Sequence, residues 1–233
     1  MVLKGFQKTT LLDYPGKVAC TVFTGGCNFR CPFCHNARLV TEQVHEEQIS
    51  EEAFFSFLKK RRGILDGVCV TGGEPLLQKD IIPFLSRIRD LGFLVKLDTN
   101  GSRPDVLKEI VDAQLVDYIA MDLKNSKEKY AKTCGLEAYP ESIDESIALI
   151  MKSGIEYEFR TTVVREFHVA EDMVSMARWI EGAPRYFLQG FIDSGNLIGD
   201  GCSAYSPAEM KELLTLVTPI IPTARLRGID DAN

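Results

Sequence analysis

The sequence predicts an α/β fold built on parallel strands, and two observations carry this prediction. Short apolar runs typical of strands alternate with amphipathic segments typical of helices along the 233 residues. Strands that alternate with helices pair in parallel, because each helix returns the chain to the start of the next strand. Six strand–helix pairs, rather than eight, predict a partial, laterally open (β/α)6 TIM-like barrel. A doubly wound open sheet is the structural alternative.

Each element has its own signal. The strands are predicted at residues 18–24, 67–71, 93–98, 116–122, 155–164 and 186–191, and the helices at 50–62, 80–91, 103–113, 142–153, 173–181 and 207–216. Ser50 is expected to cap the first helix, Pro104 lies in the first turn of the third, and Gly154 ends the fourth. No repeat or linker divides the chain, so residues 1–233 are expected to form a single domain.

Composition excludes several classes of protein. The net charge of −6 and pI of about 5.2 argue against a nucleic-acid partner. No apolar stretch has transmembrane length and the N-terminus lacks a signal sequence, so a cytoplasmic protein without a membrane partner is expected. Seven cysteines form an odd set without the spacing of a disulfide framework.

The loop after the first predicted strand carries three cysteines at a C-x3-C-x2-C spacing: Cys27, Cys31 and Cys34. Three thiolates do not fill a tetrahedral zinc site by themselves. They can hold three irons of a [4Fe–4S] cluster and leave the fourth iron open to a substrate. This spacing therefore indicates a catalytic cluster.

The next three predicted strands also end in polar motifs. These motifs are Gly72-Gly73-Glu74, Asp98-Thr99-Asn100 and Asp122-Leu123-Lys124. Because the carboxyl ends of parallel strands form the reactive face of α/β folds, the four motifs are expected to meet in one site. The two glycines serve either a tight turn or the close approach of backbone carbonyls to a ligand.

Strand alternation gives some of these side chains a direction. Residues two apart share a face, so Lys96, Asp98 and Asn100 point one way, and Glu158 and Arg160 of the fifth strand also share a face. If the apolar residues meet the outer helices, the charged residues line the barrel interior, where they need partners. The alternative is that they pair only with one another or face solvent.

The remaining cysteines and histidines give weaker signals. Cys20 and Cys69 lie in strand-like runs and are expected to be small buried side chains. Cys134 and Cys202 stand alone in turn-like sequence, and neither is assigned a function. For His45 and His168 a surface or structural role is expected.

Together these motifs resemble the radical S-adenosylmethionine superfamily. Within it, four segments resemble the activases of glycyl-radical enzymes, in particular those of anaerobic ribonucleoside-triphosphate reductases: residues 12–17 (LDYPGK), 34–36 (CHN), 96–101 (KLDTNG) and 121–124 (MDLK). The resemblance is specific from about Gly5 to Lys124 and looser towards the C-terminus.

The resemblance implies a set of roles. Cys27, Cys31 and Cys34 would ligate three irons of the cluster, and S-adenosylmethionine would chelate the fourth. Its binding residues would be His35, Asn36, Gly72, Gly73, Glu74, Asp98, Asn100, Asp122, Lys124 and Arg160. Among these, Gly72, Gly73 and Asp98 would bind the methionine amino group and Lys124 its carboxylate. Asp122 would bind the ribose, His35 and Asn36 the adenine.

The implied reaction is reductive cleavage of S-adenosylmethionine to a 5′-deoxyadenosyl radical, which removes a hydrogen atom from a glycine of a partner protein. The expected partner is a glycyl-radical enzyme, namely an anaerobic ribonucleotide reductase, and the expected electron donor is a flavodoxin or ferredoxin. Activases of pyruvate formate-lyase carry a histidine near the end of the sixth strand, where this chain has Gln189-Gly190-Phe191, so no carboxylate-binding group is assigned there. No cysteine lies between residues 37 and 68, so a single cluster is expected.

Two other functions stay open. A small-molecule enzyme of the same superfamily, such as one resembling 7-carboxy-7-deazaguanine synthase, is the first. A non-enzymatic iron–sulfur carrier or zinc-binding module is the second, and it predicts no binding of S-adenosylmethionine.

Overall fold

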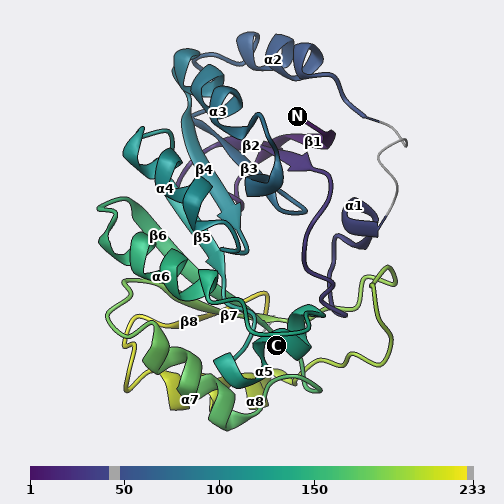
Figure 1. Cartoon of the computed structure of the whole chain (residues 1–233), viewed down its shortest axis with the longest axis vertical. Coiled ribbons are helices and arrows are strands. Elements are labelled where there is room, and N and C mark those ends of the chain that lie inside the picture. The colour runs from purple at the N-terminus through teal and green to yellow at the C-terminus, as the bar shows by residue number, and fades with distance from the viewer. Residues whose placement is uncertain (42–47, 230–233) are drawn as a thin grey trace. The chain divides into compact units, whose positions relative to one another are not determined.

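The computed structural model describes residues 1–41 and 48–229, and its eight strands follow one another in a single sheet in the order β1 to β8 (Figure 1). All neighbouring strands with a described register are parallel, except for the antiparallel pair β1–β2. A doubly wound sheet reverses its strand order at a switch point. The sequential order found here excludes that alternative and confirms the expected α/β class.

The predicted elements are all present, with ends that differ by a few residues. The six predicted strands are β2 (Ala19–Thr24), β3 (Gly67–Gly72), β4 (Leu94–Thr99), β5 (Tyr118–Asp122), β6 (Glu156–Val163) and β7 (Tyr186–Gly190). The six predicted helices are α2 (Glu51–Lys59), α3 (Ile81–Asp90), α4 (Pro104–Asp112), α6 (Ser142–Lys152), α7 (Ala170–Trp179) and α8 (Pro207–Val217). The six strand–helix pairs are therefore confirmed.

Five further elements lie outside the prediction. They are β1 (Leu3–Thr10), α1 (Ala37–Thr41), the 3-10 turn η1 (Pro75–Leu77), α5 (Lys127–Cys134) and β8 (Arg225–Arg227). The strands β1 and β8 form the two edges of the sheet. None of the helices in the described part of the chain is long and apolar enough to cross a membrane.

The chain divides into two compact units. Unit 1 comprises Met1–Asn28, Arg38–Ala120 and Ser142–Glu156, and unit 2 comprises Phe29–Ala37, Met121–Glu141 and Tyr157–Asn233. Each unit is described by itself below. The single domain expected from the sequence stays a prediction.

In unit 1, the amphipathic helices α2 and α3 bury their aromatic side chains together. The ring of Phe84 lies 5.7 Å from that of Phe54 and 5.2 Å from that of Phe55. As predicted, Ser50 caps α2, because its hydroxyl accepts a hydrogen bond from the Ala53 amide at 3.1 Å. Burial of this apolar face also holds α3 against β4.

The connection between β1 and β2 is anchored by its tyrosine. Tyr14 is buried beside Ala19, Tyr118 and Ala120, and its ring lies 6.0 Å from that of Tyr118. The neighbouring Leu12 is 90% exposed. This segment, which carries part of the family resemblance, therefore has a packing role through its tyrosine.

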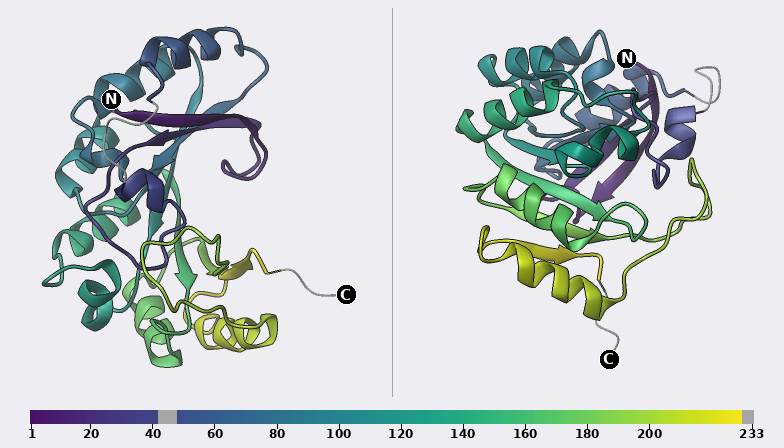
Figure 2. Two further views of the ribbon diagram at one scale, coloured as in Figure 1. Left: turned by 90° about the vertical axis from the view of Figure 1, so that its right-hand side faces the viewer. Right: turned by 60° about the horizontal axis from the view of Figure 1, so that its bottom comes forward.

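In unit 2, α7 and α8 lie side by side against the last strands (Figure 2). The hydroxyls of Thr161 on β6 and Tyr186 on β7 share a hydrogen bond of 2.9 Å in the buried layer beneath α7. On β6, the buried Glu158 accepts two hydrogen bonds from Arg227 of β8, at 2.8 and 3.1 Å. Burial of that carboxylate is thus compensated by a bidentate arginine.

Unit 2 also buries an imidazole completely. The Nδ1 atom of His168 accepts from the Val164 amide at 3.1 Å, so its Nε2 carries the proton and donates to the Lys124 carbonyl at 2.8 Å. The expectation of a structural role for His168 agrees with these contacts, whereas His45 lies outside the described residues. Burial lowers the pKa of His168 below its usual value.

The buried imidazole predicts a loss of stability in mild acid. Because the folded protein keeps His168 neutral while the unfolded chain takes up a proton below about pH 6.5, stability should fall as the pH drops through that value. One such group contributes at most about 1.4 kcal/mol per pH unit. Urea unfolding at pH 7.5 and 5.5 should show a larger loss for the wild type than for His168→Gln. Equal losses in the two proteins would contradict this prediction.

Candidate active site

The predicted site residues fall into two groups, one in each compact unit. Unit 1 holds Cys27, Gly72, Gly73, Glu74, Asp98 and Asn100, and unit 2 holds Cys31, Cys34, His35, Asn36, Asp122, Lys124 and Arg160. Within unit 1 the ends of β2, β3 and β4 come together, and within unit 2 the end of β5 meets β6. Each group has its own contacts and electrostatics.

In unit 1, the two glycines after β3 pack directly on the backbone that leads to Cys27. The Gly73 amide donates to the Thr24 carbonyl at 2.9 Å, and the Glu74 amide to the Gly26 carbonyl at 2.8 Å. A Cβ on Gly73 would lie 1.9 Å from the Gly26 oxygen, and one on Gly72 would lie 2.3 Å from the Thr24 nitrogen. Gly72 also has a positive φ of 123°. Close backbone packing therefore requires glycine at both positions.

The carboxylate of Glu74 ties the end of β3 to the end of β4. It is fully buried and accepts from the Thr99 hydroxyl at 2.8 Å and from the Asn100 amide at 2.6 Å. A third hydrogen bond, of 3.0 Å, comes from the Leu76 amide of η1. These donors compensate the burial of the carboxylate and fix the backbone at Asn100.

Asn100 in turn meets the start of the cysteine loop. Its side-chain amide nitrogen lies 3.7 Å from the Cys27 sulfur and 3.0 Å from the Asn28 side-chain oxygen. An amide N–H beside a thiolate sulfur stabilises negative charge on it. Thus the chain of contacts from Glu74 through Asn100 positions a donor at the first cysteine of the motif.

Lys96 and Asp98 point to one side of β4, as the alternation predicted, and they form a buried ion pair. The Lys96 ammonium also lies 3.8 Å from the Cys69 sulfur and 5.9 Å from the centre of the Tyr118 ring. Cys20 and Cys69 are buried, in agreement with the prediction. The carboxylate of Asp98 is thus held in place by a cation of its own strand.

In unit 2, Asp122 at the end of β5 lies between two cations. Its carboxylate is 2.5 Å from Nε of Arg160 and 2.9 Å from Nζ of Lys124. Burial would raise the pKa of Asp122, but the two positive charges outweigh it and hold the pKa well below the usual range. Likewise the charge of Asp122 outweighs burial and raises the pKa of Lys124. These three side chains carry a net positive charge, which suits an anionic group of a ligand.

Two of the three motif cysteines, Cys31 and Cys34, lie in unit 2. A hydrogen bond from Cys134 is the main cause that lowers the pKa of Cys31, against the effect of burial. Burial raises the pKa of Cys34, while the Asn36 amide and the charge of Lys124 oppose that rise. Both sulfurs therefore experience the positive charge of Lys124.

Aromatic side chains anchor this part of the cysteine loop. Phe33 is buried with its ring 5.5 Å from that of Phe167. The His35 ring stacks on Phe191 at 5.6 Å with an interplanar angle of 12°, and its Nε2 lies 2.8 Å from the Ile192 carbonyl oxygen. The structure gives His35 these partners on the segment after β7, and its contact with adenine stays a prediction.

All seven cysteines lie in the described part of the chain, and none of them is in a disulfide bond there. Among the residues that the structure describes, no three histidine, cysteine, aspartate or glutamate side chains converge around one point as metal ligands would. The ligand set of Cys27, Cys31 and Cys34 accordingly stays a prediction from their spacing. Thiolates are nevertheless the donors that iron–sulfur clusters take in proteins.

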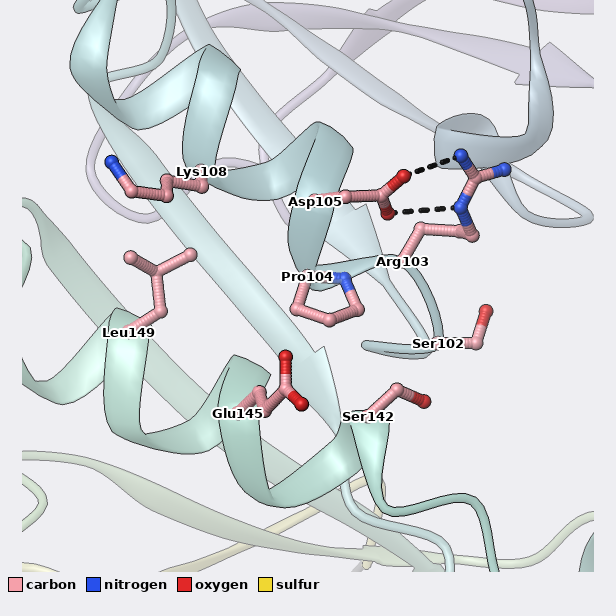
Figure 3. Close-up of a pocket in the computed structure, with 8 residues that line it drawn as sticks. All are labelled: Ser102, Arg103, Pro104, Asp105, Lys108, Ser142, Glu145 and Leu149. Atoms are coloured by element: carbon pink, nitrogen blue, oxygen red, sulfur yellow. Dashed lines mark hydrogen bonds and ion pairs between the residues drawn. The ribbon is translucent and has the colours of Figure 1, made fainter.

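A pocket of about 480 Å³ lies between the N-terminal ends of α4 and α6, in unit 1 (Figure 3). None of the predicted site residues lines it; its walls are Ser102, Arg103, Pro104, Asp105, Lys108, Ser142, Glu145 and Leu149. At its edge Arg103 and Asp105 form a bidentate ion pair, drawn in Figure 3, with distances of 2.9 and 2.7 Å. The charges along this pocket are mixed and do not favour one ligand.

Sequence reasoning gave no role to two contributors to these surroundings, Tyr130 and Cys134 of α5. It expected a surface or structural role for His168, but not the contact of this side chain with the Lys124 carbonyl, 44 positions away. The local signal for α5 is the αL glycine Gly135, which ends the helix with a φ of 67°.

Comparisons with known proteins place the chain in a family. The Radical SAM superfamily matches residues 21–180. A protein of Methanocaldococcus jannaschii with the provisional name glycyl-radical enzyme activating enzyme MJ1227 is 32% identical over 195 residues, which are 82% of this chain and 80% of that protein. The 7-carboxy-7-deazaguanine synthase of Halobacterium salinarum is 35% identical over 95 residues, 39% of this chain and 36% of that enzyme.

Solved structures share the fold. The crystal structure of Streptococcus suis SuiB bound to S-adenosylmethionine matches with a TM-score of 0.71 at 14% identity, over 88% of this chain and 49% of SuiB. The match to the superfamily covers well over half of the chain, and the archaeal relative extends it over most of both sequences. The chain therefore belongs to the radical S-adenosylmethionine superfamily, whose cofactors are a [4Fe–4S] cluster and S-adenosylmethionine, and is an enzyme homologous to glycyl-radical enzyme activating enzymes.

Proposed function

We propose that this protein activates a partner glycyl-radical enzyme by generating a radical on one of its glycines. The observation that carries the proposal is the relationship to the archaeal activating enzyme over 82% of this chain and 80% of the relative. The similarity to the deazaguanine synthase covers 39% of this chain, which is less than half as much. The segment LDYPGK at residues 12–17 supports the same assignment.

The residues present fit the expected cofactors. Cys27, Cys31 and Cys34 lie within eight consecutive positions, none of them is in a disulfide bond, and together they would ligate three irons. When bound, the cluster and S-adenosylmethionine would supply the reducing electron and the radical chemistry that acts on the partner's glycine. The positive charge of Lys124, which acts on both Cys31 and Cys34, favours their thiolate forms.

The chain's own residues would bind and orient S-adenosylmethionine. Lys124 would pair with the methionine carboxylate, because the group formed with Arg160 and Asp122 has an excess of positive charge. Asp122, kept ionised by its two cations, would accept hydrogen bonds from ribose hydroxyls. In unit 1 the carbonyls of Gly72 and Gly73 and the carboxylate of Asp98 would accept from the methionine amino group.

The partner that we propose is an anaerobic ribonucleoside-triphosphate reductase, with a flavodoxin or ferredoxin as electron donor. Its support is the set of four activase-like segments, which includes residues 96–101 and 121–124. The partial similarity to the deazaguanine synthase favours, as the second candidate, a radical enzyme that acts on a small heterocycle.

Electron paramagnetic resonance tests the activase proposal. Anaerobically reconstituted protein, mixed with reductant, S-adenosylmethionine and the reductase, should produce a glycyl doublet on the reductase. A reductase whose target glycine is replaced by alanine should give no doublet. Turnover of a small heterocycle without a protein partner would instead establish the second candidate.

Replacement of a motif cysteine tests the cluster ligands. Cys31→Ala should lose the intact cluster, because two remaining thiolates hold too few irons. Cys20→Ala, which also removes a buried thiol, should retain it. Iron and sulfide analysis after reconstitution measures both variants, and a full cluster in Cys31→Ala would refute the ligand assignment.

Replacement of Asp122 separates cofactor binding from cluster binding. Asp122→Ala should keep the iron content but bind S-adenosylmethionine at least about tenfold more weakly, since a charged hydrogen-bond acceptor is typically worth about 1.5–3 kcal/mol. The matched control is Asp105→Ala, which breaks an exposed carboxylate–arginine pair outside the site. Titration of the cluster's spectroscopic response with S-adenosylmethionine gives both affinities. Unchanged affinity in Asp122→Ala would exclude the proposed role.

A further inference from the structure

An ion pair between Glu158 and Arg227 in unit 2 has no role in the function proposed above. The side chain of Glu158 is 1% exposed, and its two oxygens accept hydrogen bonds from the Arg227 guanidinium at 2.8 and 3.1 Å. Glu158 lies on β6, whereas Arg227 lies on the edge strand β8. Because β7 runs between these two strands, the arginine reaches across a whole strand to meet the carboxylate.

The strand register places this ion pair beside Arg160. Glu158 and Arg160 are two positions apart on β6, so their side chains lie on the same face of the sheet. Phe187 of β7 is the register partner of Arg160. The Arg227 guanidinium lies over the Phe187 ring, 3.7 Å from its centre. The two arginines are therefore neighbours on one face of the sheet.

Each of the two carboxylates in this neighbourhood has its own arginine. Nε of Arg160 lies 2.5 Å from Asp122, which also contacts Lys124 at 2.9 Å. Arg227 occupies both oxygens of Glu158. A carboxylate as deeply buried as Glu158 requires such a partner. Without Arg227, Glu158 would attract Arg160, the cation beside it on the same strand. It would then compete with Asp122 for that arginine.

We propose that Arg227 is a positioning residue for the binding of S-adenosylmethionine. It neutralises Glu158 and so leaves Arg160 to Asp122. The inference rests on the proposed roles of Asp122 and Lys124 in binding that cofactor. If Arg160 turned towards Glu158, Asp122 would lose one of its two cations and attract Lys124 more strongly. The Lys124 ammonium would then be less available to the carboxylate of the cofactor.

The two members of the ion pair differ in what their loss would do. The parallel hydrogen bonds from Arg227 to both oxygens of Glu158 form a fork that a lysine cannot reproduce. With 35% of its side chain exposed, Arg227 can remain charged beside water when Glu158 is replaced. Glu158 has no such access to water. Loss of the arginine therefore leaves a buried charge that seeks a new partner, whereas loss of the carboxylate does not.

Separate replacement of the two residues tests the inference. Arg227→Met should weaken the binding of S-adenosylmethionine at least about fivefold, since neighbouring side chains of one ion-pair network are coupled by about this much. Glu158→Gln, which breaks the same ion pair but removes the competing charge, should bind as the wild type does. The double variant Glu158→Gln/Arg227→Met should also bind as the wild type does. Titration of the cluster's spectroscopic response in the reconstituted protein gives all three affinities.

Arg225→Met is the matched control, because it removes the same charge from β8. The guanidinium of Arg225 donates to the carbonyls of Pro222 and Ala224 instead of a carboxylate. This variant should therefore keep the wild-type affinity. An equal loss of affinity in Arg225→Met and Arg227→Met would overturn the inference, since it would indicate an effect of the total charge of the strand.

Two further results would overturn the inference. One is wild-type affinity in Arg227→Met. The other is an equal loss in Arg227→Met and Glu158→Gln, which would indicate that the attachment of β8 matters and not the charge of Glu158. If Arg227→Met does not fold, Arg227→Lys takes its place. A single ammonium satisfies Glu158 only in part, so affinity should fall, and addition of Glu158→Gln should restore it.

Failure of the proposed cofactor site gives a distinct result. In that case Asp122→Ala would bind S-adenosylmethionine as tightly as the wild type, whatever the effect of residue 227. A weakened Asp122→Ala together with an unchanged Arg227→Met would instead leave the cofactor site in place and refute the role of Arg227 alone.

Discussion

The constraint on which the interior of this protein depends is that charge removed from water must find a partner. Lys96 and Asp98 satisfy it as an ion pair on one strand. Asp122 satisfies it between two cations, and Glu158 through the fork of Arg227. Uncompensated burial of any of these groups would cost several kcal/mol. Charged side chains can therefore lie on the buried faces of these strands, because each of them is paired with a group of opposite charge.

Much of the fold was readable from the sequence, because periodicity reports on local structure. Alternating apolar runs gave β2 to β7, and amphipathic segments with caps such as Ser50 gave the helices between them. The edge strands β1 and β8 were not predicted, because they flank the repeated strand–helix pattern rather than form part of it. The helix α5 was not predicted, because its lysines leave too few apolar residues for an amphipathic pattern. Its stability comes from tertiary contacts such as those of Tyr130.

The candidate site was readable only in part. Motifs at strand ends predicted some of the residues that the structure brings together within each unit, since the direction of a parallel strand fixes where its carboxyl end lies. The contacts between them depend on side chains that are distant in the chain. Glu74 reaches Asn100, Arg160 reaches Asp122 across 38 positions, and His168 holds the Lys124 carbonyl. No local pattern encodes such pairings, so the prediction gave the residues without their partners.

The glycine turn after β3 has a consequence for the history of such chains. The backbone oxygen of Gly26 occupies the space that any side chain at Gly73 would need. A descendant that had lost its cysteines, its cofactors and its reaction would still need glycine there to keep β2 and β3 in their places. Retention of this glycine turn in related chains would therefore indicate a shared fold, whereas retention of the cysteines would indicate that the reaction is also shared.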